Sequence, residues 1–84
     1  MDHAKILLDR IEMVALSLSA TAKYYCQNRK VESKQQTAID YWELHGLVEA
    51  YHVLRLPRDS EHYKKVYQLL RYARYCFEQM QAHR

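Results

Sequence analysis

The sequence contains a single glycine and a single proline among its 84 residues, far fewer than an average protein of this length. Both residue types interrupt helices, so little of the chain is available for turns. A chain with one glycine also has few means of bringing backbone N–H groups around a phosphate, and no phosphate loop is present. No segment alternates apolar and polar residues with a period of two, so β-strands are not predicted.

Cysteine is scarce as well, because Cys26 and Cys76 each stand alone within a helical pattern. A secreted disulfide scaffold of this size carries four or more cysteines at framework spacing, so we expect two reduced thiols. No apolar run reaches the length of a membrane span, and Asp2 lies where a secretory signal is basic. We therefore expect a cytoplasmic protein that makes no contact with a membrane.

Helical periodicity covers most of the remaining sequence and predicts one helical domain over residues 1–84. Connections as short as those between the periodic segments place neighbouring helices antiparallel. The expected fold is therefore all-α, an up-down-up bundle of three helices that self-associates. The predicted helices cover residues 3–28, 34–55 and 60–82.

Capping residues support these limits. Asp2 is suited to cap the first helix. Ser33 and Gln36 have the spacing of a capping box, which predicts the start of the second helix. Pro57 prevents this helix from continuing past its predicted end. Asp59 or Ser60 then caps the third helix.

The helices predicted over 3–28 and 34–55 carry apolar side chains on two opposite faces, whereas an ordinary surface helix has one. One face of each helix is assigned to the core. The second faces include the only glycine, which costs about 1 kcal/mol relative to alanine inside a helix unless another backbone must approach it. We predict self-association or partner binding through these second faces, at Ile6, Met13, Tyr24, Ile39, Trp42, Gly46 and Val53.

The helix predicted over 60–82 has one apolar face and a back on which basic residues and tyrosines alternate. We predict a polar contact surface there, formed by Lys64, Tyr67, Arg71, Arg74 and Tyr75. Arginine binds phosphate and tyrosine stacks on unpaired bases, so nucleic-acid binding is an alternative function. The same residue types are common at protein interfaces, so this surface also suits an acidic protein.

Charge is distributed unevenly along the chain, whose formal net charge is +3. Residues 1–30 carry +2, residues 31–56 carry −2, and residues 57–84 carry +3. An acidic middle helix between two basic helices favours closure of the bundle and antiparallel pairing with another copy.

Glu49 and His52 form a Glu-x-x-His pair, and His45 lies one turn earlier on the same side of the helix. Helical di-iron proteins use this motif on two helices together with single glutamates from two others. A homodimer would duplicate the motif and add two copies of Glu12. A metal-binding bundle is therefore a remote alternative, and a polar seam at an interface is the favoured interpretation, with no metal or other cofactor.

The segment Arg58-Asp59-Ser60-Glu61-His62 resembles the Arg-Asn/Asp-x-x-x-His motif of HEPN-type helical ribonucleases. In that family the arginine and histidine meet at a dimer cleft. The spacing here is one residue shorter, and the chain lacks a helix of those domains. A HEPN-like ribonuclease is therefore only a remote alternative.

The sequence contains no nucleophile elbow and no Cys-x-x-Cys motif, and three amphipathic helices leave little room for a substrate pocket. We expect a protein without enzymatic activity and with no catalytic residues. The predicted function is a small protein–protein interaction module, such as an adaptor, an inhibitor of a regulator or a small chaperone. We expect it to act as a homo-oligomer, most simply a homodimer.

Overall fold

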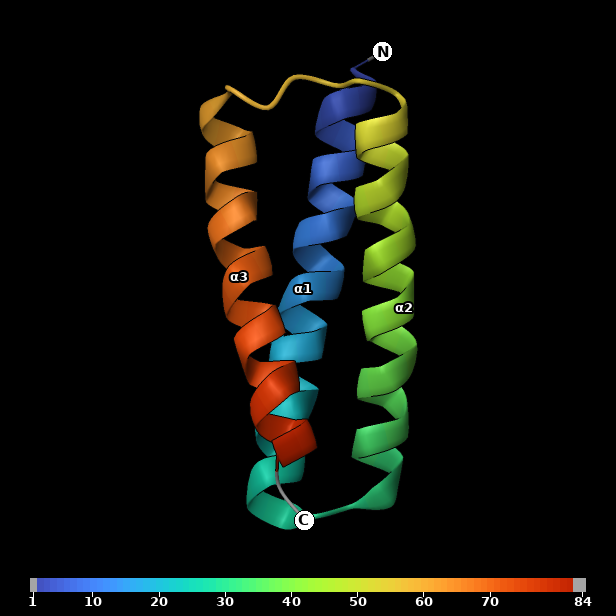
Figure 1. Cartoon of the computed structure of the whole chain (residues 1–84), viewed down its shortest axis with the longest axis vertical. Helices are drawn as coiled ribbons and strands as arrows, with labels where there is room; N and C mark the ends of the chain where they lie inside the picture. The colour runs from blue at the N-terminus through green and yellow to red at the C-terminus, as the bar shows by residue number, and fades with distance from the viewer. Residues whose placement is uncertain (1, 83–84) are drawn as a thin grey trace.

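A computed structural model describes residues 2–82 of the chain and contains three α-helices joined by two short connections (Figure 1). Helix α1 spans His3–Asn28, α2 spans Val31–Val53 and α3 spans Glu61–Ala82. Helices α1 and α3 run in the same direction and α2 runs against them (Figure 1). The described residues form no strand. The predicted all-α, up-down-up architecture is confirmed.

Helix α1 has the bounds that its sequence predicts. The Asp2 side chain accepts a hydrogen bond from the backbone N–H of Lys5 at 3.1 Å, which satisfies one donor of the first turn. At the other end Arg29 adopts a left-handed conformation with φ of 57°, and its N–H bonds the carbonyl oxygen of Tyr25 at 2.7 Å. This reversal allows α2 to begin almost immediately.

The predicted capping box at the start of α2 is wrong. The helix begins three residues before Lys34, and Lys30 is its N-cap without a side-chain hydrogen bond. Ser33 already lies in the first turn, where its N–H bonds the carbonyl oxygen of Lys30 at 3.1 Å. The Gln36 amide donates to Asp40 instead of capping. The tight reversal at Arg29 leaves no extended segment in which the box could form.

The connection between α2 and α3 also differs slightly from its prediction. Helix α2 ends at Val53, two residues early, because Arg55 turns into the left-handed region with φ of 54°. The Arg55 N–H bonds the carbonyl oxygen of His52 at 3.0 Å. Of the two candidate caps for α3, the Ser60 hydroxyl oxygen accepts a hydrogen bond from the N–H of Tyr63 at 3.1 Å. Ser60 is therefore the N-cap.

Helix α1 lies at the centre of the fold because both other helices pack along it. The face of α1 assigned to the core is buried, whereas Leu54, which the 3.6-residue period of the second helix also assigns to the core, lies exposed beyond the end of α2. The core residues of the three helices, below one tenth exposed, are Leu8, Ile11, Val14, Ala15, Leu18, Ala22, Leu44, Tyr51, Val66, Ala73, Cys76 and Met80.

A polar seam joins α1 to α2 beside the apolar core. Asp40 is buried and accepts hydrogen bonds from the Ser17 hydroxyl at 2.9 Å and from the Gln36 amide at 3.0 Å. One turn earlier on α2 the buried hydroxyl of Thr37 lies 2.8 Å from that of Thr21. These bonds satisfy the buried polar atoms and align α2 against α1.

Helices α2 and α3 contact each other only slightly, although each packs fully on α1. The radius of gyration of 13.4 Å exceeds the ~12 Å of a compact globule of this length. The molecule is therefore an elongated bundle with one open side, between α2 and α3.

Candidate protein-binding surfaces

The back of α1, opposite its core face, is an exposed apolar stripe. Ile6, Met13, Leu16 and Tyr24 are all exposed there. Ala20, also exposed, lies between the last two. Successive members are three, four or seven residues apart, which keeps them on one side of the helix. No other described part of the chain covers this stripe.

The back of α2 carries a second exposed set, formed by Ile39, Trp42 and Val53. The Trp42 side chain is 68% exposed and makes only edge contacts with neighbouring rings of its own helix. Its ring centroid lies 5.6 Å from that of Tyr41 and 6.1 Å from that of His45. Trp42 therefore contributes little to the core of a single chain.

Gly46 lies between these residues on the back of α2, and a Cβ atom built there meets nothing within 4 Å. Its backbone conformation is helical with negative φ, so the helix itself does not require glycine. A single chain therefore gives no reason for the glycine. We call the exposed residues Ile6, Met13, Leu16, Ala20, Tyr24, Ile39, Trp42, Gly46 and Val53 the outer face.

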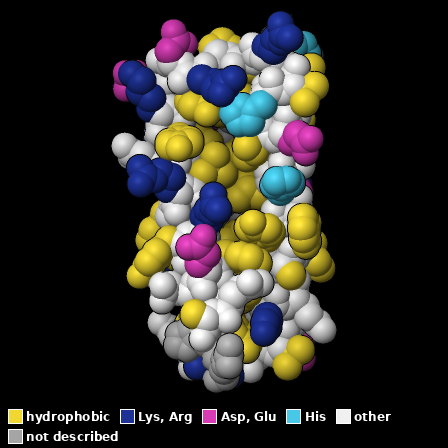
Figure 2. All heavy atoms as spheres, in the orientation of Figure 1, with side chains coloured by type: hydrophobic (Ala, Val, Ile, Leu, Met, Phe, Trp, Pro, Cys, Tyr) yellow, Lys and Arg dark blue, Asp and Glu magenta, His cyan; other side chains and the backbone are white. Residues whose placement is uncertain are grey.

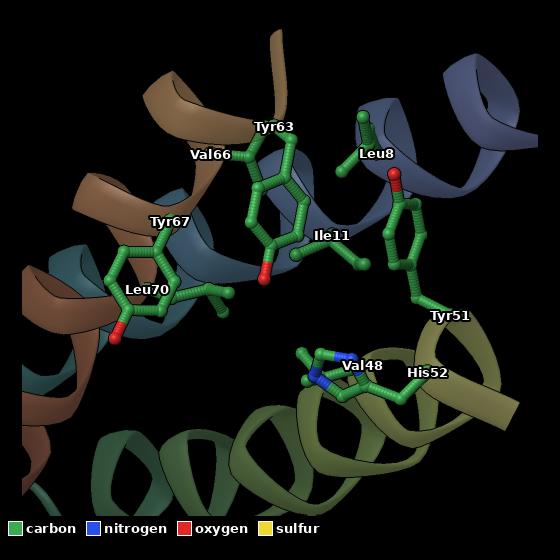
Figure 3. Close-up of a pocket in the computed structure, with 9 residues that line it drawn as sticks. All are labelled: Leu8, Ile11, Val48, Tyr51, His52, Tyr63, Val66, Tyr67 and Leu70. Carbon is green, nitrogen blue, oxygen red and sulfur yellow. The ribbon is translucent and has the colours of Figure 1, made fainter. Parts of the chain in front are cut away.

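A groove runs along the open side of the bundle, and the sequence alone did not indicate it. Hydrophobic side chains fill the hollow between α2 and α3, with basic, acidic and histidine side chains at its borders (Figure 2). The larger part of the groove has a volume of about 300 Å³ and continues past Val48 and Leu70 into a smaller part of about 50 Å³. Figure 3 shows the smaller part, where side chains from all three helices converge.

Two pairs of stacked aromatic rings bridge α2 and α3 across the groove. Tyr41 stacks on Phe77 with ring centroids 4.1 Å apart, and Tyr51 stacks on Tyr63 at 5.4 Å. The Tyr51 hydroxyl also donates a hydrogen bond to the carbonyl oxygen of Pro57. Burial raises the pKa of the Tyr51 hydroxyl above its usual value near 10.

We expect Tyr51→Phe to lower the free energy of unfolding by about 1 kcal/mol at neutral pH, because the hydrogen bond to Pro57 is lost. In the unchanged protein, the raised pKa of Tyr51 also makes the stability depend on pH. The stabilisation by the neutral hydroxyl is fully present below the unfolded pKa near 10 and is lost as the pH rises through the raised folded pKa. Denaturant titrations at neutral pH and above pH 10 test both effects. If Tyr51→Phe loses as much stability as the parent between neutral pH and pH above 10, the pH effect assigned to Tyr51 is wrong.

The predicted polar contact surface of α3 is divided between two sides of the helix. Tyr67 and Arg74 line the groove, whereas Tyr75 lines a separate hollow with Lys23 and Cys26. Lys64 and Arg71 are exposed. Arg74 pairs with Glu78 at 3.3 Å, and Lys64 pairs with Glu61 at 3.6 Å. The five residues therefore do not present one continuous cationic surface.

His45, Glu49 and His52 share a hollow on α2 with Val48 and Val53. Across the described residues, however, a different set has ligand atoms that all lie within 4.8 Å of one another, formed by Asp9, Glu12 and His62. His62 Nε2 lies 3.4 Å from Asp9 Oδ1 and 3.9 Å from Glu12 Oε2. Lys65 Nζ also approaches Glu12 Oε1 at 3.9 Å, so the arrangement is a network of close polar contacts joining α1 to α3.

The same network accounts for the histidine of the HEPN-like segment. His62 lies in the first turn of α3 and points to the carboxylates of α1, while Arg58 is exposed in the preceding turn. Sequence reasoning missed this network because Asp9 and Glu12 lie about fifty residues from His62. The one available signal was the i, i+3 spacing of the two acids, which places them on one side of α1.

Among the described residues, no helix has the length and apolar character needed to cross a membrane. Compared with protein-family models, curated proteins and solved structures, the chain gives no significant match to any of them.

Proposed function

We propose that this protein is a small protein–protein interaction module that acts as a homo-oligomer through its outer face. The observation that carries this proposal is the exposure of large apolar side chains on the backs of both α1 and α2, with open space before Gly46 on the back of α2. Contiguous apolar patches on a soluble protein mark interaction sites, because water contact with them is unfavourable. The function is binding, and the outer face is its surface.

The size of the chain supports the same conclusion. A domain of 84 residues buries a modest share of its surface, and domains this small often gain stability by oligomerisation. Tryptophan, the residue type at position 42, is among the most enriched at the centres of protein interfaces. Gly46, one turn from Trp42, permits the backbone of another helix to come close. We therefore place the centre of the contact at these two residues.

Nucleic acid is not favoured as the ligand of α3. Two of its basic side chains, Lys64 and Arg74, pair with glutamates of the same helix. Phosphate binding of useful strength needs several unpaired cations along one surface.

Trp42→Glu tests the proposal. We expect the helical content to stay unchanged, because the side chain is outside the core, and the mass measured by light scattering to fall to that of one 10.2 kDa chain. Tyr75→Glu is a matched control, since Tyr75 is an exposed aromatic residue outside the outer face. If Trp42→Glu leaves an oligomer intact, or if the unchanged protein is a monomer at every concentration, self-association through the outer face is wrong.

A further inference from the structure

The groove has the geometry of a four-helix bundle from which one helix is absent. Helix α1 supplies its floor through Leu8, Ile11 and Leu18, and α2 and α3 form its walls. The backbones of the two walls stay apart along most of their length, and the two aromatic pairs bridge them. A helix opposite α1 would contact both walls and cover the floor, and four helices around one core are a common stable arrangement.

The aromatic pairs define the length of the groove. Tyr41 and Tyr51 lie ten residues apart on one wall, and Tyr63 and Phe77 lie fourteen residues apart on the other. At the helical rise of about 1.5 Å per residue, these separations correspond to about 15 and 21 Å. The groove therefore matches a helix of three to four turns.

Charge along the groove indicates what the flanks of that helix carry. Apart from tyrosines, the ionisable side chains that line it are His45, His52 and Arg74, and none is acidic. Arg71 lies one turn before the groove-lining Arg74 and makes no ion pair with the described residues. Arg74 pairs with Glu78, and Glu49 shares a hollow with the two histidines, so the unpaired positive charge beside the groove is that of Arg71, on the α3 side.

We infer that the groove binds an amphipathic helix of a partner protein, about three turns long, with an apolar stripe flanked on its α3 side by aspartate or glutamate. The inference rests on the proposed function and names the chemistry of the partner. The apolar stripe would lie on Val48, Leu70 and the floor of α1, and the acidic flank would meet Arg71 on α3. A helix that binds in a groove in this way contacts the groove through its own residues at the i, i+3, i+4 and i+7 spacing.

Two synthetic peptides of about fourteen residues test the inference on the full chain. Both have leucine at the i, i+3, i+4 and i+7 spacing; one has glutamate at the flanking positions and the other lysine. Fluorescence anisotropy of the labelled acidic peptide should show saturable binding at or below ~100 μM, weakened by high salt, while the lysine peptide should not bind. Equal binding of both peptides, or binding of neither up to ~1 mM, overturns the inference.

Matched variants locate the site. Tyr67→Ala removes a groove residue that is 49% exposed, and Tyr75→Ala removes a residue of the same type, 57% exposed, outside the groove. Arg71→Glu reverses a charge at the border of the groove, and Lys30→Glu makes the same reversal in the α1–α2 connection. The dissociation constant of the acidic peptide should rise about tenfold or more for the groove variants and stay within about twofold for the controls. Equal weakening by the controls overturns the assignment.

Light scattering of the same samples separates this inference from the proposed function. An oligomer that binds no acidic peptide means that the groove assignment alone fails. A monomer that binds the peptide means that self-association through the outer face alone fails. If Tyr67→Ala lowers the mass of an oligomer, a second copy occupies the groove, and the inference of a foreign acidic helix is overturned.

Discussion

Replacing Leu18 by alanine should lower the free energy of unfolding by about 3 kcal/mol, while the same replacement at Leu16 should change it by less than ~0.5 kcal/mol. The two leucines are two residues apart on α1, but Leu18 is completely buried and Leu16 is 50% exposed. Removing the buried side chain loses its transfer free energy and leaves a cavity against the floor of the groove. A chain of 84 residues has a total stability of about 4–13 kcal/mol, so the first change removes a large part of it.

Urea denaturation followed by circular dichroism measures both values, at a protein concentration low enough to dissociate any oligomer. Leu16→Ala should instead weaken self-association, since Leu16 belongs to the outer face. A loss of several kcal/mol at Leu16 in the dissociated chain would show that α1 is covered on its back by the same chain. The division of α1 into a core face and an outer face would then be wrong.

Replacing Gly46 by leucine should have opposite effects on the single chain and on the oligomer. Leucine gains about 0.8 kcal/mol of helix propensity over glycine, and open space before Gly46 accommodates its side chain. In a contact centred on Gly46 the same side chain blocks the approach of the second backbone. Because each copy contributes the substitution, we expect the dissociation constant of the oligomer to rise about a hundredfold.

Sedimentation or light scattering over a dilution series gives the dissociation constant, and thermal unfolding of dilute protein gives the stability of the single chain. Gly46→Ala provides a graded comparison, because alanine improves helix propensity with a minimal side chain. A leucine variant that unfolds at a higher temperature but assembles as tightly as the parent would remove Gly46 from the interface.

Much of the fold follows from patterns within each helix. Asp2 caps α1 as predicted, and the buried faces of α1 and α3 follow the 3.6-residue period. The start of α2 could not be predicted, because the left-handed turn at Arg29 comes from a residue that seldom adopts it. Unless that turn is known, the spacing of Ser33 and Gln36 predicts a capping box at the start of the helix.

The open side of the bundle was beyond sequence reasoning for a different reason. The apolar faces of α2 and α3 suit a closed triangle as well as an open groove, since periodicity gives the direction of a face but not the distance to its neighbour. The stacked pairs Tyr41–Phe77 and Tyr51–Tyr63 place whole rings between the two helices and hold them apart. Ring stacking depends on how the helices register, and single-helix periodicity does not determine that register.

The candidate surfaces, too, could be predicted only in part from the sequence. All seven outer-face residues predicted from the second apolar faces are exposed in the structure. Of the five predicted polar residues of α3, Tyr67 and Tyr75 border different hollows, because they are eight residues apart, which turns them about 80° from each other. A seven-residue spacing would have kept them together.

The central position of α1 also has a kinetic consequence. Helices α2 and α3 both pack along α1, whereas two aromatic pairs link them to each other, so an ordered α1 stabilises both. The short reversal at Arg29 closes a small loop, so the α1–α2 hairpin carries the lower entropic cost of closure. We therefore expect this hairpin to form the folding nucleus and α3 to dock after it. In the native ensemble α3 would then be the first helix to detach, and its amides would exchange with solvent before those of α1.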